Sequence, residues 1–235
     1  MSNETQGTTR RIIELCAYNI QSGLNAEKGG ASRIELCTDA ASGGITPNYG
    51  LLDYVANNIK IPVYVMIRPR GGNFIYDNAE LEIMQKDISI CKELRFAGVV
   101  FGVLTRDNSI DTEQMKRFVD MAYPMGVTCH KAFDKVTDGY KALEDVISAG
   151  CERILTSGLQ PTALSGAGFI SELITMAANR ITIMPGGGVR SENLQTLVHN
   201  TYATEFHSSA LISKSNDSVA DINEIKALVR ILHNN

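Results

Sequence analysis

The sequence predicts an α/β fold, a single-domain (β/α)8 TIM barrel, because short apolar runs alternate with longer segments of helical period along its whole length. Eight runs have strand character: residues 12–16, 33–37, 62–68, 98–103, 126–130, 153–156, 181–184 and 203–207. The alternative is a doubly wound open sheet, but no GxGxxG motif follows the first run. We therefore expect one domain over residues 11–235, preceded by a disordered lead of residues 1–10.

The segments between the runs have apolar residues at helical spacing. They are residues 51–59, 81–94, 115–122, 140–149, 170–178, 192–199 and 218–232. Thr46 and Pro47 are typical of a helix entry, since a hydroxyl side chain caps a helix and proline suits its first position. Parallel strands beneath a layer of helices follow from this order.

The overall composition argues against several functions. The net charge is -4, and the lysines and arginines form no basic stripe, which argues against a nucleic-acid partner. No apolar run approaches the roughly 18 residues of a membrane helix and residues 1–9 are polar, so we expect a cytoplasmic protein without a membrane partner. Five cysteines without close CxxC pairs predict free thiols rather than a disulfide framework or a zinc finger.

The interior of the predicted barrel is unusually polar. Successive side chains on a strand point to opposite faces, so positions opposite the Val, Ile and Leu face should point inward. The predicted inward set is Glu14, Cys16, Glu35, Cys37, Tyr64, Met66, Arg68, Thr128, His130, Thr156, Glu205 and His207. Carboxylates are costly to bury alone, so these groups should pair, line a pocket or bind a ligand. Active sites of such barrels lie at the C-terminal strand ends, so we expect Glu35, Arg68, His130 and His207 to converge on one cavity there.

Two loops have the chemistry of an anion site. Arg68 and Arg70 offer two guanidinium groups for a carboxylate or phosphate, or alternatively neutralise interior carboxylates. Gly187 and Gly188 precede an expected helix and could hold an anion with their amides, together with Ser209 after the eighth strand. The alternative for the glycines is a tight turn.

Further polar residues at the strand ends are candidates for catalysis and ligand binding. His130 is a candidate general acid or base, with Glu35 as its partner or as the base itself. The alternative for His130 is a buried histidine that satisfies Glu35 or Glu205. Additional candidates for ligand contact are Glu14, Thr156, Ser157 and His207.

Cys16 and Cys37 end the first two strands. Neighbouring parallel strands lie about 4.8 Å apart, so the two thiols could meet. Two soft thiolates favour Cu(I) over zinc or magnesium. Two alternatives are a disulfide, which a reducing cytoplasm opposes, and small buried side chains that fill space.

From Ile13 onward the sequence resembles the CutC family of copper homeostasis proteins. The resemblance rests on the motifs ELC at 14–16, NAEKGGA at 25–31, RIELC at 33–37, GGITP at 43–47, IRPRGG at 67–72, FGVL at 101–104, HKAFD at 130–134, LTSG at 155–158 and HSS at 207–209. It implies a cytoplasmic TIM barrel, a homo-oligomer (dimer or tetramer), and copper handling with Cys16 and Cys37 as Cu(I) ligands. Lys131 stands where the family more often has arginine, which keeps the charge.

Two functional hypotheses follow. The first is a copper homeostasis protein of the CutC type that binds Cu(I) through the two cysteines. The alternative is a TIM-barrel enzyme that acts on a small anionic metabolite, for example a phosphorylated one, at the mouth of the barrel. A carrier needs little beyond the thiols, whereas an enzyme would account for the polar interior and the glycine loop.

Overall fold

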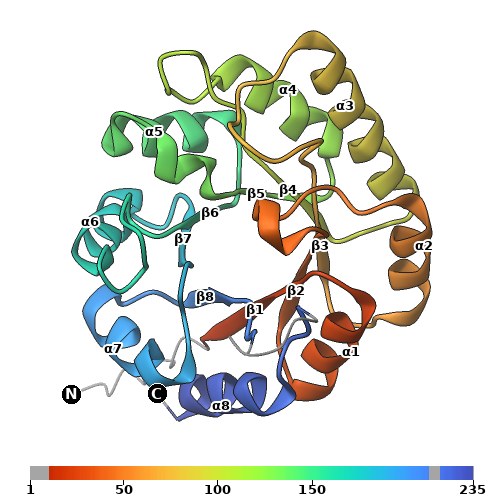
Figure 1. Ribbon diagram of the computed structural model, residues 1–235. Helices are drawn as coiled ribbons and strands as arrows, with labels where there is room; N and C mark the ends of the chain where they lie inside the picture. Colours follow the sequence, from red (N-terminus) through yellow and green to blue (C-terminus); the bar gives the residue numbers. More distant parts are fainter. Residues whose placement is uncertain (1–10, 212–217, 235) are drawn as a thin grey trace, which may run out of the picture.

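The computed structural model describes residues 11–211 and 218–234, which form a nearly closed barrel of eight parallel strands (Figure 1). The strands are β1 (Ile12–Ala17), β2 (Arg33–Leu36), β3 (Val63–Met66), β4 (Gly98–Phe101), β5 (Gly126–Cys129), β6 (Arg153–Thr156), β7 (Thr182–Pro185) and β8 (Glu205–Ser208). Their order in the sheet is β7-β6-β5-β4-β3-β2-β1-β8, and a parallel bridge between Gly186 and His207 brings the two edges together. The predicted (β/α)8 barrel is therefore confirmed, and so are all eight strands, with ends within two residues. The predicted lead, residues 1–10, lies outside the described residues.

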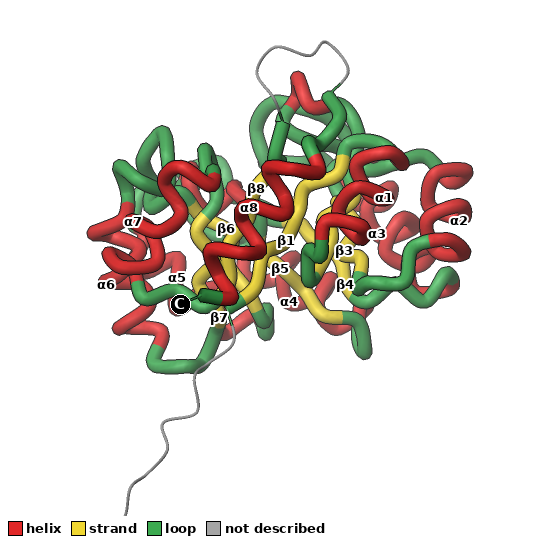
Figure 2. Tube along the Cα trace, turned by 90° about the horizontal axis from the view of Figure 1, so that it is seen from below, coloured by secondary structure: helices red, strands yellow, loops and turns green. Residues whose placement is uncertain are grey.

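Helices cover the outside of the barrel (Figure 2). They are α1 (Ile20–Gly29), α2 (Tyr49–Asn58), α3 (Asn78–Glu93), α4 (Thr112–Ala122), α5 (Gly139–Ala149), α6 (Ala167–Ala177), α7 (Ser191–Thr201) and α8 (Ile222–His233), with short 3-10 helices η1 (Ala40–Ser42) and η2 (Lys131–Lys135). Side chains of Asn or Asp cap most of the helix starts by accepting a backbone N–H of the first turn. Among the described residues, none of the helices combines the length and the apolar character needed to cross a membrane.

Helix α1 was not predicted because its buried face is made of small residues. The side that packs inward consists of Ser22, Gly23, Ala26 and Gly29, which give no apolar period. A Cβ added at Gly29 would lie 2.4 Å from Ile225 Cγ2, so the close approach of α1 to α8 requires glycine there.

The expected entry of helix α2 at Thr46 and Pro47 was wrong. Asn48 caps the helix, which begins at Tyr49. The Thr46 hydroxyl instead accepts the backbone N–H of Arg68 at 2.8 Å, which ties this loop to the end of β3. Helix α8 likewise begins later than expected, because Asp221 caps it.

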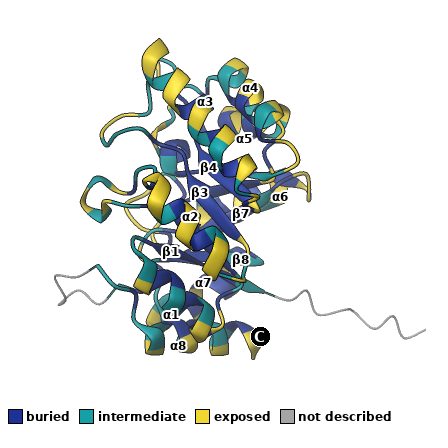
Figure 3. Ribbon diagram, turned by 90° about the vertical axis from the view of Figure 1, so that its right-hand side faces the viewer, coloured by how far each residue is buried: buried dark blue, intermediate teal, exposed yellow. Residues whose placement is uncertain are grey.

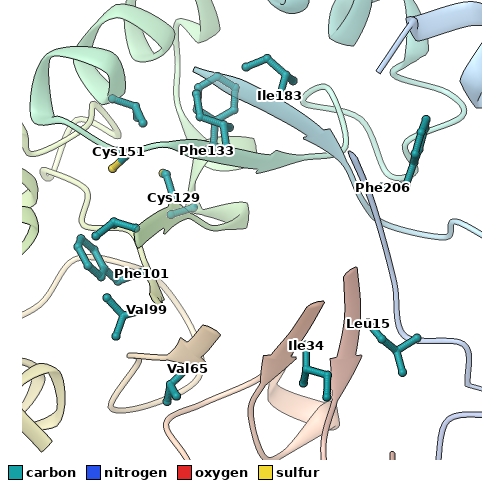
Figure 4. Close-up of a cluster of buried hydrophobic side chains, with 14 of the residues drawn as sticks. Leu15, Ile34, Val65, Val99, Phe101, Cys129, Phe133, Cys151, Ile183 and Phe206 are labelled. Carbon is teal, nitrogen blue, oxygen red and sulfur yellow. The ribbon is translucent and has the colours of Figure 1, made fainter. Parts of the chain in front are cut away.

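The hydrophobic core lies between the strands and the helices rather than inside the barrel. Leu15, Ile34, Val99 and Phe206, which come from strands around the barrel, are fully buried in this layer (Figure 4). Figure 3 shows the strands buried and the exposed residues on the outer sides of the helices. Since the apolar face of each strand is used in this way, the opposite face is left for polar groups at the barrel axis.

Candidate functional site

An ionic network fills the barrel interior near the N-terminal ends of the strands. Arg33 bonds Glu14 through Nε and lies 2.6 Å from Glu205 Oε2 through Nη2. Arg153 Nε lies 2.6 Å from the same Glu205 oxygen, and both guanidinium groups stack on the ring of Tyr64. Glu14 and Glu205 are thus paired with cations, as burial requires. Arg68 and Arg70, which were the alternative candidates for this pairing, do not take part in it.

Sequence reasoning missed both arginines of this network. Arg33 has the same parity as Glu35, so the alternation on β2 was a signal that could have found it. On β6 the predicted parity was wrong: Arg153 and Leu155 face inward, and Thr156 does not. Leu155 was expected to face outward because it is apolar. In the structure Ile154 is the residue of β6 that packs into the outer core, and Leu155 lines the cavity.

A cavity of about 180 Å³ lies above this network, at the C-terminal ends of the strands. Glu35, Arg68, His130 and His207 all line it, so the predicted convergence of these four side chains is confirmed. Residues of the loops that follow the strands complete the lining, among them Lys131, Gly187, Gly188 and Ser209.

His207 connects the ionic network to the cavity. Its Nδ1 lies 2.8 Å from Glu14 Oε1, and its Nε2 lies 3.8 Å from Glu35 Oε2. Burial opposes the charged imidazolium, but the carboxylates of Glu35 and Glu14 outweigh it and raise the pKa of His207 well above its usual range. Burial also favours the neutral form of Glu14, yet Arg33 and His207 hold its pKa at about 2. His207 and Glu14 therefore form a charged pair.

Glu35 differs from Glu14 in its partners. Burial, with a further contribution from the negative charge of Glu14, raises the pKa of Glu35. Its Oε1 is buried and has no hydrogen-bond partner among the described residues. Glu35 therefore keeps one buried carboxyl oxygen that no described residue satisfies.

Cys16 and Cys37 meet beside Glu35. Their Sγ atoms lie 3.3 Å apart, both residues are buried, and both are free thiols, so the predicted adjacency is confirmed. The hydrogen bond between the thiols, together with burial, raises the pKa of Cys16 well above its usual range. That bond lowers the pKa of Cys37, but burial and the Glu35 charge outweigh it and raise the value. Without a metal ion both groups are thus neutral thiols at neutral pH.

The two thiols and Glu35 form a set of possible metal ligands. One ligand atom from each of the three residues lies within 4.8 Å of the other two, and a second set of this kind is Glu14, Glu35 and His207. Soft sulfur donors distinguish the first set from the second, which offers only oxygen and nitrogen. Cys16 also lines the cavity, which gives an ion a route to the pair.

His130 is almost completely buried at the cavity wall, 3% exposed. Its Nδ1 accepts the backbone N–H of Ala132 at 3.2 Å, and its Nε2 has no partner in the described chain. Burial and the positive charge of Arg68 lower the pKa of His130 to about 3. The ring is therefore neutral, and because Nδ1 accepts, the proton lies on Nε2. His130 hydrogen-bonds neither Glu35 nor Glu205.

The two arginines expected to hold an anion make contacts with other parts of the protein. Arg68 lines the cavity, but its guanidinium donates to the carbonyl oxygens of Ser42, Gly44 and Gly72 at 2.7, 2.9 and 2.8 Å. Arg70 does not line the cavity, since its Nε lies 2.5 Å from Glu80 Oε1. Arg68 thus holds the neighbouring loops together through their carbonyl groups, and Arg70 forms an ion pair outside the cavity.

Thr156 and Ser157 do not line the cavity either. Their hydroxyl groups donate to the carboxylate of Asp134 at 2.5 and 2.9 Å. Asp134 thereby holds η2 against the end of β6, and Lys131 in the same turn lies 3.5 Å from Asp134. These hydroxyl groups position the loop that carries Lys131.

The glycine loop after β7 faces the cavity as expected. Gly187 and Gly188 have φ values of 101° and 73°, a region that favours glycine. The tight turn that they make also forms part of the cavity wall. The amide of Ser191, at the start of α7, is already bonded to Glu224 at 2.7 Å. Amides of the loop, rather than the helix terminus, are therefore the groups that a ligand could meet.

These features define a (β/α)8 barrel protein with a charged cavity at its C-terminal mouth and a buried dithiol at the edge of that cavity. Residues 11–212 match the CutC family, and the chain belongs to this family. It is 50% identical over 202 residues to a CutC family protein of Parabacteroides distasonis, with 86% of this chain and 83% of that protein covered.

Animal proteins and solved structures are also similar. The chain is 47% identical over 203 residues to the mouse copper homeostasis protein cutC homolog, covering 86% of this chain and 75% of that protein. A crystal structure of a CutC protein from Streptococcus agalactiae has a TM-score of 0.80 at 36% identity, over 85% of this chain and 98% of that one. Phosphoribosylanthranilate isomerase from Thermotoga maritima has a TM-score of 0.63 at 12% identity, over 96% and 100%, and shares the fold alone.

Proposed function

We propose that this CutC family protein takes part in copper homeostasis in the cytoplasm by binding one Cu(I) ion through Cys16 and Cys37. The observation that carries the proposal is the 3.3 Å separation of the two Sγ atoms. Thiolates are the protein ligands that select Cu(I), and two of them at this separation can share one ion. All five cysteines are free thiols, in keeping with a reducing compartment.

The surroundings of the thiols suit a monovalent cation. Two thiolates and one Cu(I) carry a net charge of −1, and the His207 imidazolium next to Cys16 offsets it. Glu35 lies within reach as a third donor. Because both thiols have raised pKa values, Cu(I) must displace their protons, so binding releases protons.

An anaerobic titration with Cu(I) against a chromogenic chelator tests the proposal. We expect one Cu(I) per chain for the wild type and a large loss of affinity for Cys16→Ser and for Cys37→Ser. Cys151→Ser is the matched control, because Cys151 is also a buried free thiol but lies in the outer core layer. Equal uptake by the wild type and the Cys16→Ser, Cys37→Ser double variant would show that the ion binds elsewhere.

A further inference from the structure

The geometry points to a second ligand in the cavity that is independent of copper: a small phosphorylated molecule whose phosphate lies against Lys131, Gly187, Gly188 and Ser209, and whose other end accepts a hydrogen bond from His130. This site differs from the arginine pair that the sequence suggested, since Arg70 is outside the cavity and Arg68 is bonded to backbone carbonyls.

The first support is a set of buried polar atoms without partners. Native structures bond the large majority of such atoms, so each exception needs a reason. Three of these atoms belong to residues that line this one cavity: Glu35 Oε1, Arg68 Nε and His130 Nε2. A ligand with acceptor atoms for Arg68 Nε and His130 Nε2, and with a hydroxyl group that donates to Glu35 Oε1, would satisfy all three atoms.

The second support is the sign of the charge around the cavity. Arg68, Lys131 and Arg190 line the cavity and carry positive charge. Two carboxylates oppose them: Glu35, the one carboxylate among the described residues of the lining, and Asp134, which lies behind the lining 3.5 Å from Lys131. A cavity with this excess of positive charge favours an anion.

The third support is the loop geometry. A Cβ added at Gly187 would lie 3.0 Å from Lys131 Nζ, so the ammonium group lies directly beside the glycine loop. No backbone hydrogen bond within the described chain occupies the N–H of Gly187 or of Gly188. An ammonium group beside two such amides is the arrangement that binds a phosphate monoester.

The distribution of groups places the phosphate at one end of the ligand. Lys131, with 42% of its side chain exposed, and the exposed Gly188 belong to loops at the open end of the cavity, whereas His130 and Glu35 are each only 3% exposed. A neutral imidazole that donates from Nε2 bonds a hydroxyl or carbonyl oxygen. Glycerol 3-phosphate has both parts and is small enough for a cavity of about 180 Å³.

Binding is tested by calorimetry and by 31P NMR in a phosphate-free buffer, with inorganic phosphate, glycerol 3-phosphate and glycerol as probes. The wild type should bind glycerol 3-phosphate more tightly than inorganic phosphate, and glycerol not at all at millimolar concentration. Lys131→Ala should weaken binding of both anions by about tenfold or more, the usual effect of losing a charged hydrogen-bond donor. Lys131→Arg should restore most of the affinity.

Two controls make the result specific. Lys135→Ala removes the same charge from the same 3-10 turn, but Lys135 is exposed and lies outside the cavity, so affinity should not change. Cys37→Ser should leave anion binding intact, which separates this result from the copper proposal. No saturable binding by the wild type, or an equal loss in Lys131→Ala and Lys135→Ala, would overturn the inference. Equal affinity for inorganic phosphate and glycerol 3-phosphate would overturn the role given to His130.

Discussion

Nδ1 of His207 lies 2.8 Å from Oε1 of Glu14, a carboxylate with no exposed surface. This contact joins the ionic network of the barrel interior to the cavity, because the opposite ring nitrogen faces Glu35. The polar interior is therefore one connected set of charges rather than separate pairs.

Replacing Glu14 by Gln should be strongly destabilising. It removes the partner of two buried cations, Arg33 and His207, and breaking a buried pair in this way costs about 3–5 kcal/mol. Urea unfolding followed by circular dichroism measures the loss. Glu82→Gln, an exposed site on α3, should change stability by less than about 0.5 kcal/mol. Equal stability of the two variants would contradict the role of the network.

The Glu14 pair also predicts how stability depends on pH. The pKa of Glu14 is about 2 in the folded protein and 4.5 in the unfolded chain. The stability that the ionised Glu14 contributes is therefore fully present above about pH 4.5 and is lost as the pH falls toward 2. His207 has the opposite sign: its raised pKa adds stability below its usual value of 6.5, and that contribution is lost as the pH rises through the raised value. The difference in unfolding free energy between the wild type and His207→Gln should therefore shrink as the pH rises through the raised pKa of His207. Urea unfolding at a series of pH values measures this difference.

Copper affinity should increase with pH. Because burial and the thiol pair raise the pKa of Cys16 and keep that of Cys37 above its usual value, each thiol must lose a proton to bind Cu(I). Two protons released per ion correspond to an apparent affinity that rises by about a hundredfold per pH unit. Competition titrations between pH 6 and 8 measure the slope, and an affinity independent of pH would rule out the buried thiols as ligands.

Gly44 should control copper binding without offering a ligand. Its φ is 95°, and a Cβ there would lie 3.3 Å from Cys37 Sγ. Gly44→Ala should therefore displace the thiol and weaken Cu(I) binding, at a stability cost of about 1 kcal/mol. Gly72→Ala is the matched control, since φ is 87° there but the added Cβ would meet only Arg70 at 3.8 Å. Both variants should lose stability, and only the first should lose affinity.

The sequence was sufficient to predict the barrel and part of the cavity lining, because strand periodicity and strand ends are local properties. Glu35, Arg68, His130 and His207 sit at such ends and were predicted to converge. The partners of each side chain depend on the three-dimensional arrangement instead. Arg153 lies 52 positions before Glu205 in the chain, and Arg70 turns outward to a glutamate on α3, which no periodicity shows.

X-ray absorption at the copper edge, on protein loaded anaerobically with one equivalent of Cu(I), tests the central claim most directly. We expect two sulfur ligands in the wild type and one in Cys37→Ser, with the Cys151→Ser spectrum unchanged from wild type. A first shell made only of nitrogen and oxygen atoms, or two sulfur ligands that persist after Cys16 and Cys37 are both replaced by serine, would contradict the assignment of this thiol pair as the copper site.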